Sequence, residues 1–277
     1  MALSFHKMHG AGNDFVLIDA RGLTFELSPE QAKHIANRHT GIGCDQLLVL
    51  RAAGDAAHRV RYEIWNSDGS PAAQCGIGAR CVGLYLDLQD GAADGPFTAE
   101  SPSGVVTMRR CPDREYEVEM GVPEFTPRQV PVTLTPFDGE YRLPSPWGVL
   151  EFTAVSMGNP HALLTGIGID DPEIPEIAAF IDRHEGFPEG CNVGVAELQT
   201  RDRIRLRVVE RGAGETLACG SGACAAVAVL HRAGRVGDAV EVFLPGGRLV
   251  IKWRGKQEPL IMKGPAEHVF RGIWNER

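Results

Sequence analysis

Two cysteines in this chain of 277 residues stand in nearly the same short phrase, and cysteine is a residue that can both release and accept a proton. Cys75 begins Cys-Gly-Ile-Gly-Ala, and Cys219 begins Cys-Gly-Ser-Gly-Ala. The reference pKa of a thiol lies within roughly 2 units of neutral pH, so modest tuning suits it to acid or base catalysis. A single Cys-Gly pair is more often part of a core or a turn. The repetition is what indicates chemistry.

Each of these cysteines stands where a predicted strand and turn give way to an apolar helix, the first at 79–89 and the second within 218–234. The first N–H groups of a helix have no intrahelical partner and favour negative charge, and glycines let a ligand approach them closely. We therefore expect a lowered thiol pKa and an anion site shaped for a carboxylate. Two such helix ends, facing each other across a domain interface, would place a thiol on each face of a substrate α-carbon. That arrangement suits inversion of the α-carbon.

Further matches recur in the same order and at a nearly constant offset, which indicates an internal duplication. Asn66 and Glu210 each end a predicted strand at the same distance before their cysteine. The other pairs are Gly12-Asn13 with Gly158-Asn159, and Gly43-Cys44-Asp45 with Gly190-Cys191-Asn192. One match could arise by chance, but four in the same order are hard to explain without duplication.

The elements of the two halves follow the same plan. In the first half, a helix with Ser28 as N-cap, Pro29 at its first position and Gly41 as terminator follows a strand-like segment. Strands at 46–52 and 58–66, the helix at 79–89 and a hairpin at 104–110 and 116–121 come next. The second half repeats this order with strand-turn-strand at 152–166, a helical region at 170–190, strands at 192–198 and 203–212, and a helix closed by Gly234.

These patterns predict an α/β fold of the α+β type with two pseudo-symmetric domains, each a curved mixed sheet around a central helix. Prolines accumulate at 119–131, so the boundary is expected there. The predicted N-terminal half is 1–119, completed by 265–277, and the C-terminal half is 120–264.

Composition narrows the class of protein. A hydrophobic content of 43%, a charged content of 23% and a net charge of −8 fit a globular protein, and argue against nucleic acid or an anionic membrane as partner. We find no signal-peptide pattern and no apolar run of transmembrane length. The spacing of the seven cysteines does not suggest a disulfide framework, so we expect a cytoplasmic protein with reduced thiols. The cysteines without the double-glycine context are interpreted as structural: Cys44, Cys81, Cys111, Cys191 and Cys224.

Longer motifs along the whole chain resemble those of the diaminopimelate epimerase family, the cofactor-independent epimerases of lysine and cell-wall precursor biosynthesis. The segments are KMHGAGNDFVLID, GIGCDQLLV, NSDGSPAAQCGIGARC, MGNPH, EGCNVGV and ERGAGETLACGSGACA. The resemblance implies interconversion of LL- and meso-diaminopimelate, with Cys75 and Cys219 as the two bases. It also implies that neither pyridoxal phosphate nor a metal is needed, and a homodimer is expected.

The resemblance also assigns the supporting residues. Glu210 would meet the ammonium group of the reacting centre and, with His161, would tune the thiols, although the sequence does not say which residue serves which cysteine. The residues expected to hold the unreactive end of the substrate are Asn13, Asn66, Asn159, Asn192 and Arg211. Gln46 matches a further active-site position, and the backbone amides for the reacting carboxylate come from Gly76-Ile77 and Gly220-Ser221. Ile77 departs from the family pattern, which usually has asparagine there.

Other classes of protein fit less well. A proline or hydroxyproline racemase uses the same two-thiol chemistry, but ERGAGETLACGSGACA favours diaminopimelate. A nucleotide-binding module would need Gly-x-Gly-x-x-Gly or a phosphate loop, and neither phrase completes such a motif. A thiol redox or metal site would need Cys-x-x-Cys or a matching histidine spacing, which the sequence lacks.

Overall fold

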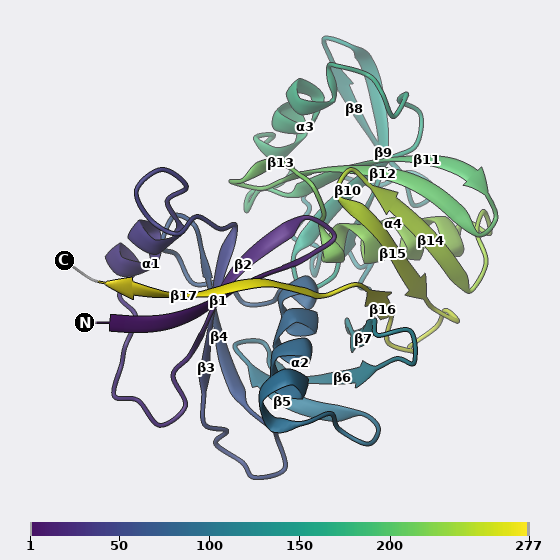
Figure 1. The fold of residues 1–277 in the computed structure, drawn as a ribbon. Coiled ribbons are helices and arrows are strands. Elements are labelled where there is room, and N and C mark those ends of the chain that lie inside the picture. Colours follow the sequence, from purple (N-terminus) through teal and green to yellow (C-terminus); the bar gives the residue numbers. More distant parts are fainter. Residues whose placement is uncertain (1, 276–277) are drawn as a thin grey trace. The chain divides into compact units, whose positions relative to one another are not determined.

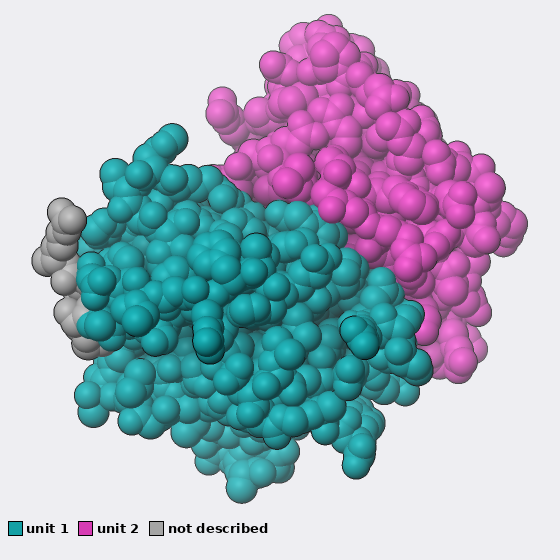
Figure 2. Space-filling model, in the orientation of Figure 1, with its two compact units in different colours: residues 1–119, 263–277 teal, residues 120–262 magenta. Residues whose placement is uncertain are grey.

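In the computed structural model, which describes residues 2–275, the chain folds into two units. Unit 1 consists of 1–119 together with 263–277, and unit 2 consists of 120–262 (Figure 2). The C-terminal segment therefore returns to the unit that the N-terminal segment begins. The two ends of the described chain lie in neighbouring strands of that unit (Figure 1).

Unit 1 is a mixed sheet in the order β17-β1-β2-β3-β4-β5-β6-β7. The β2–β3 and β4–β5 pairs are parallel, and the other pairs are antiparallel. Its strands are β1 (Ala2–Gly10), β2 (Asn13–Asp19), β3 (Gln46–Arg51), β4 (Arg61–Asn66), β5 (Phe97–Ser101), β6 (Gly104–Arg110), β7 (Tyr116–Glu119) and β17 (Glu267–Asn275). Helix α2 (Gly76–Asp90) packs against β1 and β17 and also against β6 and β7. Because strands from both ends of the order contact one helix, the sheet curves around α2.

Unit 2 repeats this plan in the order β8-β9-β10-β11-β12-β14-β15, with β10–β11 and β12–β14 parallel. Its strands are β8 (Tyr141–Ser145), β9 (Gly148–Ser156), β10 (Pro160–Leu164), β11 (Asn192–Thr200), β12 (Arg203–Glu210), β14 (Ala239–Leu244) and β15 (Gly247–Lys252). The short strand β13 (Gly214–Thr216) pairs with the end of β12, and β16 (Ile261–Gly264) follows β15. Helix α4 (Gly220–Arg232) packs against β9, β10 and β15, so this sheet also curves around its helix.

The second helix of each unit covers the other face of the sheet. Helix α1 (Pro29–Ala36) packs on β3 and β4, and α3 (Ile174–Asp182) packs on β11 and β12. Strand β3 is buried on both faces, from Leu47 to Leu50, because helices lie on both sides of it. The α/β fold class, with a mixed sheet curved around a helix, is confirmed.

One helix end predicted from the sequence is wrong. Ser28 is the N-cap of α1, as predicted, and it also forms a capping box with Gln31. However, α1 ends at Ala36 with Asn37 as C-cap, before Gly41. The N–H of Gly41 donates to the carbonyl of Asn37, so the residues after Ala36 fold back as a turn instead of extending the helix.

The end of α4 follows the prediction. Gly234 has a φ of 69°, and its N–H donates to the carbonyl of His231, while the N–H of Arg235 donates to that of Leu230. This pair of bonds is a Schellman motif, in which a glycine takes the left-handed conformation at low cost.

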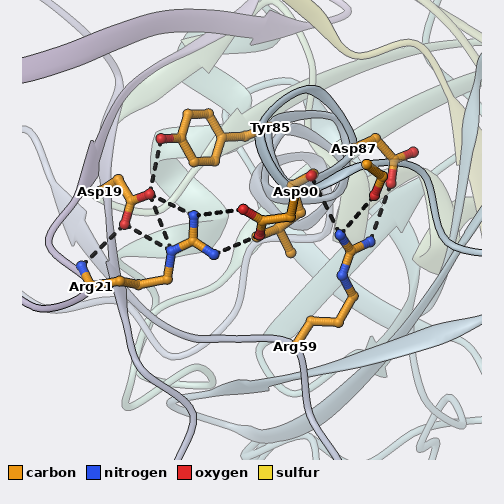
Figure 3. A network of polar contacts seen from close by, with 8 residues as sticks. Asp19, Arg21, Arg59, Tyr85, Asp87 and Asp90 are labelled. Carbon is orange, nitrogen blue, oxygen red and sulfur yellow. Dashed lines mark hydrogen bonds and ion pairs between the residues drawn. The ribbon is translucent and has the colours of Figure 1, made fainter.

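The C-terminal end of α2 is instead held by side chains, as Figure 3 shows. The guanidinium of Arg21 donates to both oxygens of Asp19, at 3.0 and 2.7 Å, and to Asp90 at 2.6 Å (Figure 3). The hydroxyl of Tyr85 donates to Asp19 at 3.0 Å. Arg21 therefore ties the last turn of α2 to the end of β2.

A second arginine holds the same turn from another side. Arg59 donates to the carboxylate of Asp87 at 3.2 Å and to the carbonyl of Gly91 at 3.0 Å. The hydroxyl of Tyr116 donates to the other oxygen of Asp87 at 2.6 Å. A cation at the C-terminal end of a helix also stabilises the helix dipole.

At its N-terminal end, α2 packs on β1 through Ile77. This side chain is 1% exposed, and a Cβ atom placed on Gly10 of β1 would lie 2.7 Å from its Cγ2. The missing side chain at Gly10 therefore makes room for Ile77. The Ile77 side chain is therefore a packing contact with β1.

Replacing Ile77 by asparagine should destabilise unit 1 by about 3 kcal/mol, because burial of the isoleucine is lost and an amide is buried in apolar surroundings. Ile77→Val should cost only about 1 kcal/mol. Urea unfolding of both variants and the parent measures the difference. If the asparagine variant were as stable as the valine variant, Ile77 would not be a packing residue.

Candidate functional site

Cys75 is the N-cap residue of α2. Its backbone is extended, with φ −151° and ψ 100°, and its Sγ accepts a hydrogen bond from the N–H of Gly78 at 3.3 Å. The N–H groups of Gly76 and Ile77 belong to the first turn, where a helix offers no acceptor of its own. The thiol and two backbone donors thus lie at one helix end, as the sequence predicts.

Cys219 repeats this geometry at the start of α4. It is extended, with φ −123° and ψ 111°, and its Sγ accepts from the N–H of Gly222 at 3.4 Å. The hydroxyl of Ser221 lies 3.6 Å from the same sulfur. Gly220 and Ser221 take the place that Gly76 and Ile77 take in α2. A Cβ on Gly222 would lie 3.3 Å from the sulfur and 2.9 Å from Val208, so the first turn of α4 packs closely at this glycine.

Cys219 differs from the expectation in its ionisation. The thiol is 3% exposed and donates to Oε2 of Glu210 at 3.1 Å. Burial first, and the neighbouring Glu210 carboxylate second, raise the pKa of Cys219 well above its ordinary value. The predicted lowering of the thiol pKa is therefore wrong for Cys219, because desolvation and a like charge outweigh the helix end. Of the two cysteines, Cys219 is the one that Glu210 contacts, a pairing that the sequence left open.

The other oxygen of Glu210 has a partner that the sequence analysis missed. The hydroxyl of Thr216 donates to Oε1 of Glu210 at 2.7 Å. Thr216 lies on β13, a three-residue strand too short for periodicity to indicate. Its position between Glu210 and Cys219 was the available signal.

In unit 1, three predicted polar residues lie at the same end of three neighbouring strands, which we call the polar edge of the sheet. Gln46 begins β3 and lies opposite Asn66, the last residue of β4, and Asn13 begins the neighbouring strand β2. Gln46 Nε2 donates to Asn66 Oδ1 at 2.9 Å, and Asn66 Nδ2 donates to Ser70 at 3.1 Å. A Cβ on Gly78 would touch Phe15 of β2 and Leu48 of β3, so the first turn of α2 lies against these same strands.

Two acceptors at this edge are buried and unused. Asn13 Oδ1 and Gln46 Oε1 have no hydrogen-bond partner among residues 2–275. A buried acceptor without a donor costs about 1–3 kcal/mol, so a ligand that supplies N–H groups would remove this penalty. An ammonium group has the required chemistry.

In unit 2, His161 lies on β10 and is 2% exposed. Its Nε2 lies 3.0 Å from Oδ1 of Asn159, so an Nε2–H donating to that oxygen leaves Nδ1 as the acceptor. Burial first, and the positive charge of Arg211 second, lower the pKa of His161 to about 3. His161 is therefore neutral at physiological pH.

Asn192 and Arg211 lie beside this histidine. Asn192 is opposite His161 in the β10–β11 pair, and its amide donates to the carbonyl of Pro160 and accepts from the N–H of Arg211. The guanidinium of Arg211 is exposed and donates to the carbonyl of Glu189 at 2.5 Å. Asn192 thus holds the ends of β10 and β12 in place on either side of β11.

The matched positions of the two halves also share backbone geometry. Gly12 and Gly158 have φ values of 85° and 89°, and Gly43 and Gly190 have 82° and 67°. A left-handed turn thus precedes the polar edge in both units. Each unit brings together its own share of the predicted residues: Asn13, Gln46, Asn66, Cys75, Gly76 and Ile77 in unit 1, and Asn159, His161, Asn192, Glu210, Arg211, Cys219, Gly220 and Ser221 in unit 2.

The remaining cysteines lie elsewhere. Cys44, Cys81, Cys191 and Cys224 are buried, and Cys111 is partly exposed. Burial raises the pKa of Cys44 to about 12. Within residues 2–275, no cluster of three or more histidine, cysteine, aspartate or glutamate side chains is placed to bind a metal ion. In the same part of the chain, no helix is long and apolar enough to span a membrane.

A cavity of about 740 Å³ in unit 2 lies apart from these residues. Its lining includes Trp147 and Phe152 of the β8–β9 hairpin, Ile177 of α3, and Leu230 and Arg235 at the C-terminal end of α4. Cys219 caps the opposite end of α4, and none of the predicted site residues lines the cavity.

Comparison with known proteins bears on these helix ends. The model of the family described as diaminopimelate epimerase matches residues 5–126 and 153–269, which include both cysteines. A diaminopimelate epimerase of Xanthomonas axonopodis pv. citri (strain 306) is 48% identical over 275 residues, covering 99% of this chain and 96% of that protein. One of Xylella fastidiosa (strain 9a5c) is 46% identical over 273 residues, covering 98% and 96%.

Solved structures with low sequence identity share the fold. A hydroxyproline epimerase from Agrobacterium vitis superposes with a TM-score of 0.71 at 16% identity, covering 98% of this chain and 92% of that one. A predicted epimerase from Pseudomonas aeruginosa gives 0.67 at 15% identity, covering 99% and 100%.

The solved structures share about one residue in six with this chain, so they show the fold alone. The curated relatives are nearly half identical to this chain over almost all of its length. With the doubled thiol cap in place, the resemblance seen in the sequence is confirmed: this chain belongs to the diaminopimelate epimerase family.

Proposed function

We propose that the protein is an isomerase that interconverts LL- and meso-diaminopimelate without pyridoxal phosphate, in the synthesis of lysine and peptidoglycan precursors. The observation that carries this proposal is the pair of thiols, each the N-cap of a helix at the same point of a repeated fold. The relatives of this chain that bear the name diaminopimelate epimerase support the choice of substrate. The predicted epimerase halves, 1–119 with 265–277 and 120–264, differ from the two units by the placement of residues 263 and 264.

The reaction exchanges one proton for another at the α-carbon. One thiolate removes the α-proton from one face, and the thiol on the other face delivers its own proton. Cys219 suits delivery in this state, because burial and Glu210 keep it protonated. Cys75 then removes the proton, and the roles reverse in the opposite direction.

The charge that develops on the carboxylate needs fixed donors. The first-turn N–H groups of Gly76 and Ile77, and of Gly220 and Ser221, have no intrahelical acceptors and point out of their helix ends. The buried side chain of Ile77 does not weaken this role, since the backbone N–H is the donor. The residue that departs from the family pattern is therefore compatible with activity.

The residues proposed to recognise the unreactive end are polar side chains at the strand ends of each unit. The unused acceptors of Asn13 and Gln46 suit an ammonium group, and the planar guanidinium of Arg211 suits a carboxylate. His161 is buried and neutral, so it supports proton transfer as a base or a hydrogen-bond partner, with no charge of its own. The other residues proposed to bind the unreactive end are Asn66, Asn159 and Asn192.

The protein works in the cytoplasm as a homodimer in this proposal. Within residues 2–275 none of the seven cysteines forms a disulfide, which fits a reducing compartment. On β17, the apolar side chains of Val269 and Ile273 are 54% and 66% exposed. Exposed apolar side chains on a terminal strand of the sheet are a suitable contact for a second copy.

The first test is epimerisation of LL-diaminopimelate in D₂O, followed by deuterium incorporation at the α-carbon and by formation of the meso isomer. Cys75→Ala and Cys219→Ala should each lower turnover roughly 10²- to 10⁴-fold, because each removes one of the two proton-transfer groups. Cys111→Ala, which alters a thiol outside both helix ends, serves as the matched control and should retain full activity. Exchange with proline or hydroxyproline but not with diaminopimelate would overturn the proposal.

The second test concerns His161. The pKa of His161 is lowered in the folded state. In the unfolded chain this histidine is protonated below about pH 6.5, whereas in the folded chain it is protonated only below about pH 3. The stabilisation is present above pH 6.5 and is lost as pH falls, by about 2 kcal/mol between pH 7 and pH 5. His161→Gln should flatten this slope in urea unfolding, whereas His39→Gln, at an exposed turn, should not. Equal slopes for the parent and His161→Gln would contradict a buried neutral histidine.

The third test concerns association. Ile273→Asp should shift the dimer to a monomer in size-exclusion chromatography with light scattering, because a buried charge at this position of the contact opposes close packing. Val105→Asp changes a residue of similar exposure on β6 and should leave the dimer intact. A dimer that survives Ile273→Asp, or a protein that is monomeric throughout, would remove β17 as the contact.

A further inference from the structure

The hairpin of β12 and β13 has two faces, one that packs on α4 and one that carries an ion pair. Its register pairs Val208 with Thr216, Val209 with Glu215, and Glu210 with Gly214. Side chains alternate between the faces of a strand, so Thr216 and Glu210 share one face as diagonal neighbours. A Cβ on Gly222 would lie 2.9 Å from Val208, so this is the face that meets the first turn of α4.

On the face toward α4, the Glu210 carboxylate is held between two donors. Thr216 Oγ1 donates to Oε1 at 2.7 Å, and Cys219 Sγ donates to Oε2 at 3.1 Å. The two bonds use different oxygens, so the threonine fixes the orientation of the carboxylate without competing for the thiol. A carboxylate at the end of a flexible glutamate side chain otherwise has several rotamers.

On the opposite face, Arg207 fixes the hairpin itself. Its guanidinium donates to both oxygens of Glu215, at 2.6 and 2.9 Å, which is a bidentate pair. The same side chain donates to the carbonyls of Ile169 and Asp171, each at 3.1 Å. The Arg207 hydrogen bonds lower the pKa of Glu215, which keeps the pair charged. A three-residue strand with few ladder bonds gains its register from this pair.

We propose that Thr216 is a positioning residue that aims the Glu210 carboxylate at the Cys219 thiol, and that Arg207 and Glu215 hold Thr216 in register to do so. This inference rests on the proposed function, since it concerns one of its two thiols. Thr216 does not touch the reacting atoms. It acts by leaving Glu210 a single productive orientation before the substrate arrives.

The experiment compares Thr216→Val with Thr216→Ser and with Thr200→Val. Thr200 also donates to a carboxylate, that of Asp202, but at the far end of β11, so its variant is the matched control. With LL-diaminopimelate, Thr216→Val should lower kcat roughly tenfold to hundredfold and change KM by less than about twofold. Thr216→Ser should recover most of kcat, and Thr200→Val should match the parent.

A second readout needs no substrate. Iodoacetamide labels Cys219 at a rate that follows its thiolate fraction, measured by mass spectrometry of the peptide. A carboxylate no longer aimed at the sulfur raises the thiol pKa less, so Thr216→Val should be labelled roughly threefold faster or more at pH 8. Thr216→Ser and Thr200→Val should be labelled at the parent's rate.

The register is tested by Arg207→Gln. It should lower kcat less than Thr216→Val does, and the double variant should be no slower than Thr216→Val alone, because both changes act through the same carboxylate. Multiplying effects would contradict the link between the two faces.

The outcomes separate the two proposals. If the parent and Thr200→Val do not epimerise diaminopimelate, the proposed function fails, and the labelling rates alone decide the role of Thr216. If the parent is active and Thr216→Val keeps both its kcat and its labelling rate, Thr216 does not position Glu210. A loss of kcat that Thr216→Ser does not restore would likewise overturn the inference.

Discussion

A sulfur atom accepting a backbone N–H at the start of a helix is the interaction on which both half-sites depend. N-caps are usually oxygen acceptors such as serine or aspartate. Cys75 and Cys219 take that place here, bonding the N–H of Gly78 and Gly222. The bond orients each thiol at the helix end and leaves the two N–H groups before it free of intrahelical acceptors. One local contact therefore both positions the sulfur and leaves the first two backbone N–H groups of the helix available as donors.

The glycines that donate to the sulfurs also serve packing. A side chain at Gly78 or Gly222 would crowd the strand beneath, at Leu48 in one unit and at Val208 in the other. The glycine after the cap is therefore a packing requirement as well as a feature of ligand access. The repeated Cys-Gly-x-Gly phrase is the sequence form of this geometry.

Much of this could be predicted from the sequence because the information is local or repeated. The caps, the helices behind them and the Schellman end at Gly234 depend on neighbouring residues, and the duplication exposed the matched strand ends at Asn66 and Glu210. The ionisation of Cys219 could not be predicted, since it depends on burial and on a carboxylate brought close by the fold. Thr216 was missed for a similar reason, because its task appears only once β13 is paired.

The two central helices end in different ways. Helix α4 closes with backbone bonds at Gly234, whereas α2 ends in side-chain bonds from Arg21 and Arg59 to residues near its last turn. The first needs only the left-handed conformation of one glycine. The second needs charges from separate segments of the chain, so the C-terminal end of α2, opposite the end capped by Cys75, is held by tertiary contacts.

Strand β17 gives the chain an order of assembly. It pairs with β1 along its length, with Phe270 edge-on against Phe5, although unit 2 separates the two strands in the chain. On the ribosome, β1 is synthesised first, and it cannot pair with β17 until the whole of unit 2 has been synthesised. Closing so long a loop is also slow in refolding. The first unit to be translated is thus the last to be completed, and the apolar face beneath β1 is the surface that a chaperone would meet in the interval.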